Sequence, residues 1–300
     1  MRILFITATR IGDSVISTGL LDYLVEQYPH SRITVVCGPL ASSLFNSIPG
    51  LEQIITLEKE TFGLHWFKLW LTVRGRRWDL VVDLRRSLIS YLLQTERRSV
   101  LGHDNDKLHR VEFLSTMFNL DLPRAPRLWV TSHHEAAAFN ILPWDKPFIV
   151  VAPIAAQSEK TWPLDRFVRL VDRLTASDGC FSGCKVVVVG GEEDRSVLTS
   201  YVSELRVANS YILAGCQDLL VVAAILRRSA LTIANDSGMA HVAAAAGSPT
   251  LALFGATKPS LYAPRGKKVK LVKAEEAGEG GSMADISVDE VYNEAENFLK

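Results

Sequence analysis

One stretch decides the fold of this chain: LTIANDSGMAHVAAAAGSPTLALF, residues 231–254. It begins with an apolar run, passes through a polar turn into an alanine-rich segment over 238–246, and ends in a second apolar run at 250–254. Because both runs are almost wholly apolar and do not alternate, they predict strands buried on both faces of a parallel sheet. The stretch therefore predicts a strand, a helix and a second strand of one α/β sheet.

A membrane span is the alternative interpretation of the same stretch. Residues 237–257 carry no charge and are long enough to cross a bilayer. However, Gly247-Ser248-Pro249 interrupts the stretch and His241 lies inside it, so a helix, a turn and a buried strand fit it better. The apolar run after Arg2 is too short for a secretory signal. We therefore expect a cytoplasmic protein whose membrane contact is at most peripheral.

The same alternation of strand and helix extends outward in both directions. Further strands are expected at 2–7, 32–36, 51–57, 79–83, 99–101, 148–152, 185–189 and 211–213. Composition changes near Leu142-Pro143-Trp144, which suggests a hinge. We predict an α/β protein with two Rossmann-like domains that face each other across a cleft. The expected parts are domain 1–145, domain 146–284, and a C-terminal helix within 285–300 that could pack back towards the N-terminal domain.

Composition and charge exclude several classes of protein. The 300 residues are 48% hydrophobic and 22% charged, which is typical of globular proteins and excludes disorder. Lys+Arg and Asp+Glu both number 33, so the net charge is 0 and a nucleic-acid partner is not expected. Four cysteines in a chain of this length do not make a disulfide framework.

Polar loops follow the predicted strands, where parallel sheets bind their ligands. The loop after the first strand carries Arg10 and Asp13 at the start of a helix. Asp13 is either a helix cap or a general base at the mouth of the cleft. The loop lacks the G-x-G-x-x-G pattern, so it is not a dinucleotide fingerprint.

Two loops of the second half carry charged candidates. Lys160 precedes Trp162-Pro163, which begins a helix, so its ammonium could bind a phosphate there or be an exposed lysine in a polar loop. Glu192 and Glu193 follow Gly190-Gly191. Either acid could accept hydrogen bonds from ribose hydroxyls, or both could only favour the helix N-terminus that follows.

The most specific loop is Asn235-Asp-Ser-Gly-Met-Ala-His241. Its turn can direct the Ser237 hydroxyl and several backbone N–H groups at a pyrophosphate. His241 lies one turn into the helix, where a lone histidine is more often structural.

Four motifs together resemble those of glycosyltransferase family 9, the heptosyltransferases that use ADP-heptose: Arg10-Ile-Gly-Asp13, Lys160-Thr-Trp-Pro163, Asn235 to His241, and Phe254-Gly-Ala-Thr257. The resemblance implies a GT-B fold and an inverting, metal-independent transfer of heptose to a lipopolysaccharide core, with no cofactor. It implies that Asp13 is the general base and that Glu192 or Glu193 holds the ribose. It also implies a set of donor-binding residues: Lys160, Asp236, Ser237, Gly238, Met239 and His241.

The resemblance also implies an anionic acceptor at the cytoplasmic face of the inner membrane. Residues 59–98 contain nine Lys or Arg against four Asp or Glu, which suits phosphates or carboxylates. Arg10 and Arg85 are the first candidates for acceptor contacts, because they follow strands and do not lie within helices.

Several alternatives remain open. Asp104-Asn105-Asp106 could hold the metal of another transferase class, although a polar loop explains it more simply, and His133-His134-Glu135 lacks the spacing of a helical zinc site. The chain could be a catalytically silent relative that binds a nucleotide or glycan, or a transferase of the same fold that uses another nucleotide-sugar. An NAD-dependent oxidoreductase would need the missing glycine fingerprint.

Overall fold

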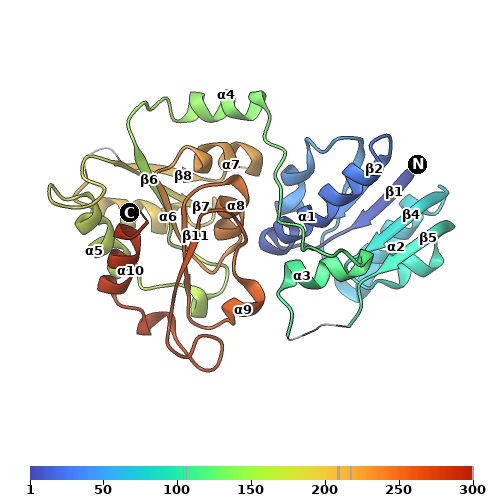
Figure 1. Cartoon of the computed structure of the whole chain (residues 1–300). Helices are drawn as coiled ribbons and strands as arrows, with labels where there is room; N and C mark the ends of the chain where they lie inside the picture. Colours follow the sequence, from blue (N-terminus) through green and yellow to red (C-terminus); the bar gives the residue numbers. More distant parts are fainter. Residues whose placement is uncertain (104, 106, 208–209, 217, 299–300) are drawn as a thin grey trace. The chain divides into compact units, whose positions relative to one another are not determined.

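The computed structural model describes residues 1–103, 105, 107–207, 210–216 and 218–298, and the chain forms two compact units, Met1–Trp129 and Val130–Lys300 (Figure 1). The boundary therefore lies at 129/130 and not at the expected 145/146. The physical reason is α4 (Ser132–Ile141), which packs against α7 (Leu219–Arg227) of the second unit. The guanidinium of Arg228 also donates to the carbonyl oxygens of Leu142 and Trp144, each at 3.0 Å.

The first unit is built on a five-stranded sheet with the order β3-β2-β1-β4-β5, and every pair of neighbouring strands is parallel. Its strands are β1 (Arg2–Ile6), β2 (Arg32–Cys37), β3 (Leu51–Thr56), β4 (Trp78–Asp83) and β5 (Thr95–Val100). Its helices are α1 (Ile11–Gln27), α2 (Leu64–Val73) and α3 (Arg110–Ser115), with short 3₁₀ turns η1 (Pro39–Phe45), η2 (Thr61–Gly63), η3 (Leu88–Leu92) and η4 (Thr116–Phe118).

The second unit is built on a six-stranded parallel sheet with the order β11-β10-β9-β6-β7-β8. Its strands are β6 (Phe148–Ala152), β7 (Lys185–Gly190), β8 (Ser210–Ala214), β9 (Leu231–Asn235), β10 (Thr250–Phe254) and β11 (Val269–Lys273). The remaining helices are α5 (Leu164–Thr175), α6 (Arg195–Glu204), α8 (Gly238–Ala246), α9 (Pro259–Tyr262) and α10 (Val288–Glu296), with turns η5 (Ser158–Lys160) and η6 (Met283–Asp285).

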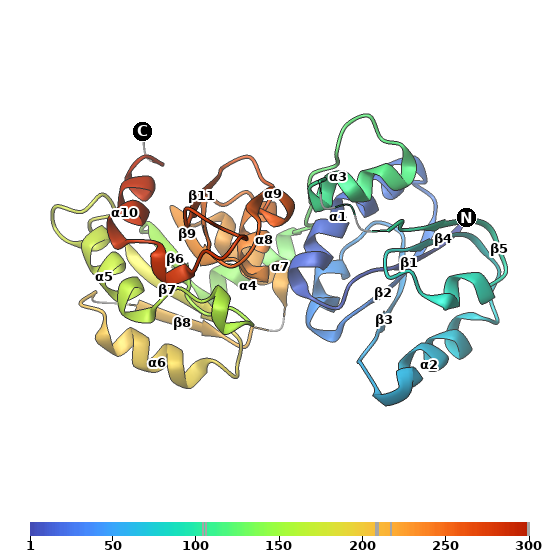
Figure 2. The same ribbon diagram turned by 90° about the horizontal axis from the view of Figure 1, so that it is seen from below.

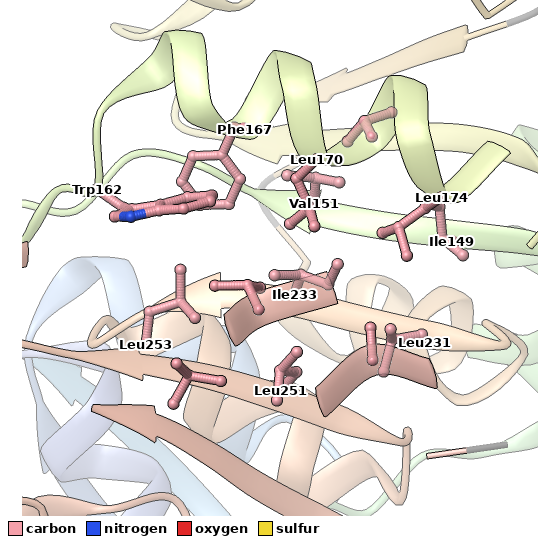
Figure 3. Close-up of a cluster of buried hydrophobic side chains, with 14 of the residues drawn as sticks. Ile149, Val151, Trp162, Phe167, Leu170, Leu174, Leu231, Ile233, Leu251 and Leu253 are labelled. Carbon is pink, nitrogen blue, oxygen red and sulfur yellow. The ribbon is translucent and has the colours of Figure 1, made fainter. Parts of the chain in front are cut away.

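The apolar strands of the second unit bury their side chains against α5 (Figure 3). Leu170 of this helix lies against Val151 and Phe167 lies beside Trp162, and all four side chains are fully buried. This burial is what the continuous apolar runs predict, because a strand covered on both faces has no solvent side. Within the described residues, no helix combines the length and apolar composition needed to cross a bilayer.

The C-terminal helix α10 packs on α5 within the second unit (Figure 2). Ser287 caps it, because its hydroxyl accepts the N–H of Glu290 while the Glu290 carboxylate accepts the N–H of Ser287. Arg173 of α5 pairs with Asp289 and lies over the ring of Tyr292, 3.8 Å from its centroid. These contacts differ from the expectation that the helix could return to the N-terminal domain.

Helix α1 lies close to the segment that leaves the first unit, at a glycine. A Cβ atom on Gly19 would lie 2.2 Å from the carbonyl oxygen of Arg124 and 2.8 Å from that of Ala125. Alanine normally stabilises a helix interior relative to glycine by about 1 kcal/mol. Here the backbone would have to move, so the close approach requires glycine.

We predict that Gly19→Ala lowers the free energy of unfolding by about 1–3 kcal/mol, because overpacking outweighs the gain in helix propensity. Urea denaturation followed by circular dichroism measures the change. Gly75→Ala is the matched control, since a Cβ there meets no atom within 4 Å. A stability of Gly19→Ala equal to or above that of the wild type would contradict the close packing.

Candidate nucleotide-binding and catalytic residues

The buried carboxamide of Asn235, at the end of β9, holds the loop that follows β6. Its Oδ1 accepts the backbone N–H of Trp162 at 3.1 Å, and its Nδ2 donates to the carbonyl oxygen of Pro153 at 2.7 Å. Both ends of the loop 153–162 are therefore attached to one side chain. A side chain that uses both its donor and its acceptor inside the protein fixes the loop in one position.

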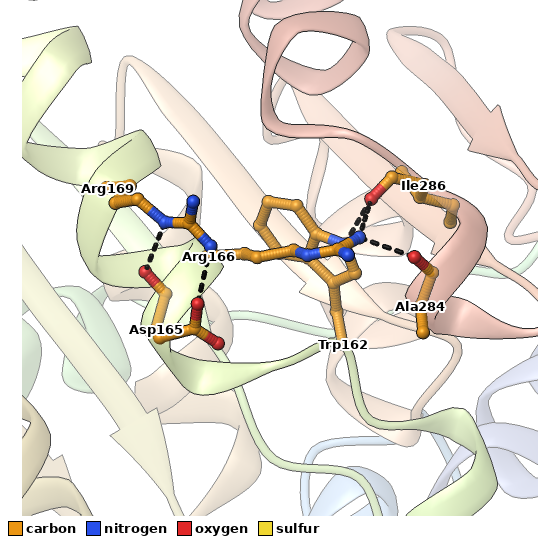
Figure 4. Close-up of polar contacts among 6 residues, drawn as sticks. All are labelled: Trp162, Asp165, Arg166, Arg169, Ala284 and Ile286. Carbon is orange, nitrogen blue, oxygen red and sulfur yellow. Dashed lines mark hydrogen bonds and ion pairs between the residues drawn. The ribbon is translucent and has the colours of Figure 1, made fainter.

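Trp162 is fixed from a second side as well (Figure 4). Its indole N–H donates to the carbonyl oxygen of Ile286 at 2.9 Å, and the guanidinium of Arg166 donates to the same oxygen and to that of Ala284. The indole ring is fully buried. The loop that carries Lys160 is thus anchored both to β9 and to the segment that leads into α10.

Asp236 joins three loops at one carboxylate. Its Oδ2 lies 2.9 Å from the ammonium of Lys160, in the loop after β6, and accepts the hydroxyl of Thr257, in the loop after β10. Asp236 is 7% exposed and Lys160 is partly exposed. The structure therefore brings Lys160 and Asp236 together and adds Thr257, whose motif was noted in the sequence but to which no role was assigned.

The N-terminus of α8 has polar groups without partners. Ser237 is the residue before the helix and has an extended backbone (φ −143°, ψ 167°), but its side chain makes no capping hydrogen bond. Its hydroxyl oxygen is buried and has no hydrogen-bond partner among the described residues. A serine at this position usually accepts an N–H of the first helical turn. Here the hydroxyl and the N–H groups that begin at Gly238 remain able to bind an anion.

Met239 and His241 lie on the same short helix. The side chain of Met239 packs against a small apolar cluster that includes Phe254, and His241 is buried one turn into the helix. Packing therefore accounts for part of the Met239 side chain, and the donor contacts expected of Met239 and His241 stay predictions.

The two glutamates after β7 differ in their surroundings. Arg195 donates two hydrogen bonds to the Glu192 carboxylate and a third, at 3.0 Å, to the carbonyl oxygen of Ala214. The hydrogen bonds from Arg195 hold the pKa of Glu192 below its usual range. Glu193 is exposed and lies over Gly191, where a Cβ would approach its carboxylate to 2.4 Å. In the described part of the chain, no hydrogen bond or ion pair joins either glutamate to Lys160 or Asp236.

In the first unit, Arg10 and Asp13 lie at the start of α1. Arg10 precedes the helix and Asp13 belongs to its first turn. Among the residues that the structure describes, no group forms a hydrogen bond or ion pair with the Asp13 carboxylate. A partly exposed carboxylate without a partner is available to accept a proton.

Arg85 reaches the same loop from the end of β4. Its guanidinium lies 3.5 Å from the Thr9 hydroxyl. The turn that carries it is built by the fully buried Asp83, whose carboxylate accepts the backbone N–H of Arg85 and both the N–H and hydroxyl of Ser87. Asp83 was not among the predicted site residues, although an aspartate at the end of an apolar strand is a recognisable signal for such a turn.

The structure gives no support to the two metal sites considered as alternatives. Asp104 and Asp106 lie outside the described residues. His134 shares its Nδ1 with the backbone and hydroxyl of Thr131, which orients its ring at the start of α4. Within the part of the chain that is described, no three His, Cys, Asp or Glu side chains gather as a metal site would require.

Comparison with known proteins gives consistent matches over the whole chain. The family model of glycosyltransferase family 9 (heptosyltransferase) matches residues 108–283. Lipooligosaccharide heptosyltransferase 2 of Haemophilus ducreyi is 25% identical over 351 residues, which cover 100% of this chain and 99% of that protein.

Two solved structures show the same fold. E. coli ADP-heptose lipopolysaccharide heptosyltransferase II is 22% identical with a TM-score of 0.83, covering 100% of this chain and 98% of that one. An E. coli heptosyltransferase solved with ADP is 17% identical with a TM-score of 0.75, covering 99% of this chain and 100% of that one. The predicted GT-B fold is confirmed.

We predict that Asn235→Ala lowers the free energy of unfolding by about 2–4 kcal/mol, because the Trp162 N–H and the Pro153 carbonyl oxygen lose their buried partner. Urea denaturation measures the loss. Asn293→Ala, at an exposed position of α10, is the matched control and should change stability by less than about 0.5 kcal/mol. Equal effects of the two substitutions would show that Asn235 does not hold the loop.

Proposed function

Because the chain belongs to glycosyltransferase family 9, as its motifs indicated, it is a glycosyltransferase, and we propose that it moves heptose from ADP-heptose onto a lipopolysaccharide core. The names of its relatives support the choice of sugar and acceptor. One structural observation carries the proposal. Lys160, paired with Asp236, lies in the loop beside the N-terminus of α8, where the Ser237 hydroxyl has no partner.

These groups suit the diphosphate of a nucleotide-sugar. The hydroxyl of Ser237 and the N–H groups from Gly238 onward can donate to phosphate oxygens, and the helix dipole favours negative charge there. Lys160 can move its ammonium from Asp236 towards the diphosphate, and His241 would support the first turn of the helix. Because negative charge builds on the leaving diphosphate, fixed donors and one cation stabilise the transition state without requiring a metal.

The transfer is proposed to be a single displacement. Asp13 accepts the proton of the acceptor hydroxyl, whose oxygen then forms a bond to the anomeric carbon of heptose. The bond between that carbon and the diphosphate oxygen breaks, and ADP leaves with both phosphates. In-line attack on the opposite side inverts the anomeric configuration. No cofactor takes part in this scheme.

The remaining contacts follow from charge. Arg10 and Arg85 flank the loop of Asp13 and would bind phosphates or carboxylates of the acceptor. Glu193 is the better candidate for the ribose hydroxyls, because Glu192 is already paired with Arg195. The acceptor places the reaction at the cytoplasmic face of the inner membrane.

We predict that the wild type adds one heptosyl residue to a lipopolysaccharide core acceptor in the presence of ADP-heptose, and that Asp13→Asn lowers turnover by about 10²–10⁴ while leaving ADP affinity nearly unchanged. Mass spectrometry of the acceptor and release of ADP measure the reaction. Glu26→Gln is the control, because this carboxylate lies near the other end of α1 in an exposed pair with Arg124.

Each failure has its own meaning for the reaction. Product formed from another nucleotide-sugar, but not from ADP-heptose, would change the donor. Binding of ADP without any transfer would point to a silent relative. An Asp13→Asn variant that turns over like the wild type would remove the base assignment while leaving the transfer intact.

For the donor site, we predict that Lys160→Ala weakens ADP binding about tenfold or more, because a charge-assisted hydrogen bond to phosphate is lost. Isothermal titration calorimetry measures the affinity, and Lys146→Ala, an exposed lysine, is the control. Lys160→Ala also leaves Asp236 without its cation. The double variant Lys160→Ala/Asp236→Asn removes that unpaired charge, so wild-type ADP affinity in the double variant would overturn the role of Lys160.

A further inference from the structure

Helix α2 of the first unit is apolar on both of its sides. Leu69 and Val73 face inward and pack in the cluster that covers one face of the five-stranded sheet. Leu64, Phe67 and Leu71, spaced at i, i+3 and i+7, form a second stripe that is 46–56% exposed. The only fully charged side chain in the ten residues is Lys68. A surface helix normally carries polar residues on its outer side, so the outer stripe needs a partner.

The turn before α2 extends this apolar surface. Phe62 is fully exposed and has a positive φ of 55°. A non-glycine residue in the left-handed region costs about 1–2 kcal/mol, and a bulky aromatic is unusual there. The chain therefore holds an aromatic ring outward in an unfavourable conformation, and neither packing nor hydrogen bonding of the ring offsets the cost.

The turn η3 lies beside α2 and adds further apolar side chains. Ile89 and Leu93 pack in the same buried cluster as Leu69. Leu88, directly before Ile89, is 80% exposed, and Tyr91 and Leu92, between Ile89 and Leu93, are also exposed. We name the α2–η3 surface by its seven exposed members: Phe62, Leu64, Phe67, Leu71, Leu88, Tyr91 and Leu92.

Cations surround these apolar side chains. The four acids of residues 59–98 already have partners: Glu60 pairs with Lys68 of α2, Asp79 with the N-terminal amine and Glu96 with Arg77, and Asp83 is buried in its turn. Lys59, Arg74 and Arg98 have no carboxylate partner among the described residues. The guanidinium of Arg74 lies over Trp70, 4.6 Å from the ring centroid, and that of Arg98 lies 5.2 Å from the centroid of Tyr91.

We propose that the α2–η3 surface docks the protein onto a bilayer that contains anionic lipid. Leucine and aromatic side chains bordered by Lys and Arg are the chemistry that inserts at the boundary between headgroups and acyl chains. A second copy of this chain would oppose the same positive charges across the interface and is disfavoured. The inference deepens the proposed function and rests on it only for the presence of a membrane-bound acceptor.

The test is flotation of the whole protein with vesicles, without ADP-heptose or acceptor. Wild type should bind vesicles of phosphatidylglycerol and phosphatidylcholine, bind phosphatidylcholine alone more weakly, and lose affinity as salt is raised. The variant Phe62→Ser/Leu64→Ser/Phe67→Ser/Leu71→Ser should lower the partition coefficient about a hundredfold or more, because four inserting side chains are removed.

The matched control is Leu40→Ser/Leu122→Ser, since these side chains, 71% and 77% exposed, lie on other parts of the first unit. It should bind vesicles like the wild type. Absence of wild-type binding to anionic vesicles, or equal loss in the control and the fourfold variant, would overturn the proposal. A concentration-dependent dimer abolished by the fourfold substitution, with vesicle binding unchanged, would also overturn it and identify a second copy as the occupant.

If the fourfold variant does not fold, Phe62→Asn is used in its place for the vesicle-binding measurement. Asparagine tolerates the left-handed region, so this substitution should raise thermal stability while lowering vesicle affinity. Unchanged vesicle affinity would count against the proposal. Transfer to a water-soluble, delipidated core acceptor is measured in parallel. A substituted variant that loses vesicle binding but still transfers heptose to this acceptor supports the docking surface. A wild type that binds vesicles but does not transfer heptose contradicts only the proposed function.

Discussion

The carboxamide of Asn235 is the interaction on which the functional edge of the second unit depends. It stands at the end of β9, a strand that lies between β6 and β10 in the sheet. Its donor and acceptor reach opposite ends of one loop, so the position of Lys160 follows from the position of the strand. Asp236 then sets the charge of this edge, because its carboxylate accepts both Lys160 and Thr257.

Trp162 extends the same constraint to the C-terminal part of the chain. Its backbone N–H donates to the carboxamide oxygen of Asn235, and its indole N–H donates to the carbonyl oxygen of Ile286. Its ring packs against Phe167, with the two ring centroids 4.8 Å apart. One residue therefore links the β9 turn, the core under α5 and the segment before α10. This link explains why the last helix belongs to the second unit. It also explains why a substitution at the sheet edge should lower the free energy of unfolding.

Much of the fold follows from the sequence because buried parallel strands appear as continuous apolar runs. The edge strand β5 was expected at 99–101 but occupies Thr95–Val100, since its polar side chains lie at the border of the sheet and leave no such run. The domain boundary was misplaced because the hinge composition near residue 142 follows α4, and no local signal records that α4 packs on α7. Among the site residues, Lys160 and Asp236 could be placed from their loops, whereas the pairing of Glu192 with Arg195 depends on how the turn closes.

The proposed donor site is best tested by a crystal structure of the protein with ADP. We expect the diphosphate at the N-terminus of α8, with a phosphate oxygen within hydrogen-bonding distance of the Ser237 hydroxyl and the Lys160 ammonium. We also expect the backbone of the loop 153–162 to keep its attachment to Asn235. A nucleotide bound elsewhere in the chain, with the Ser237 hydroxyl still without a partner, would show that α8 is not the diphosphate site.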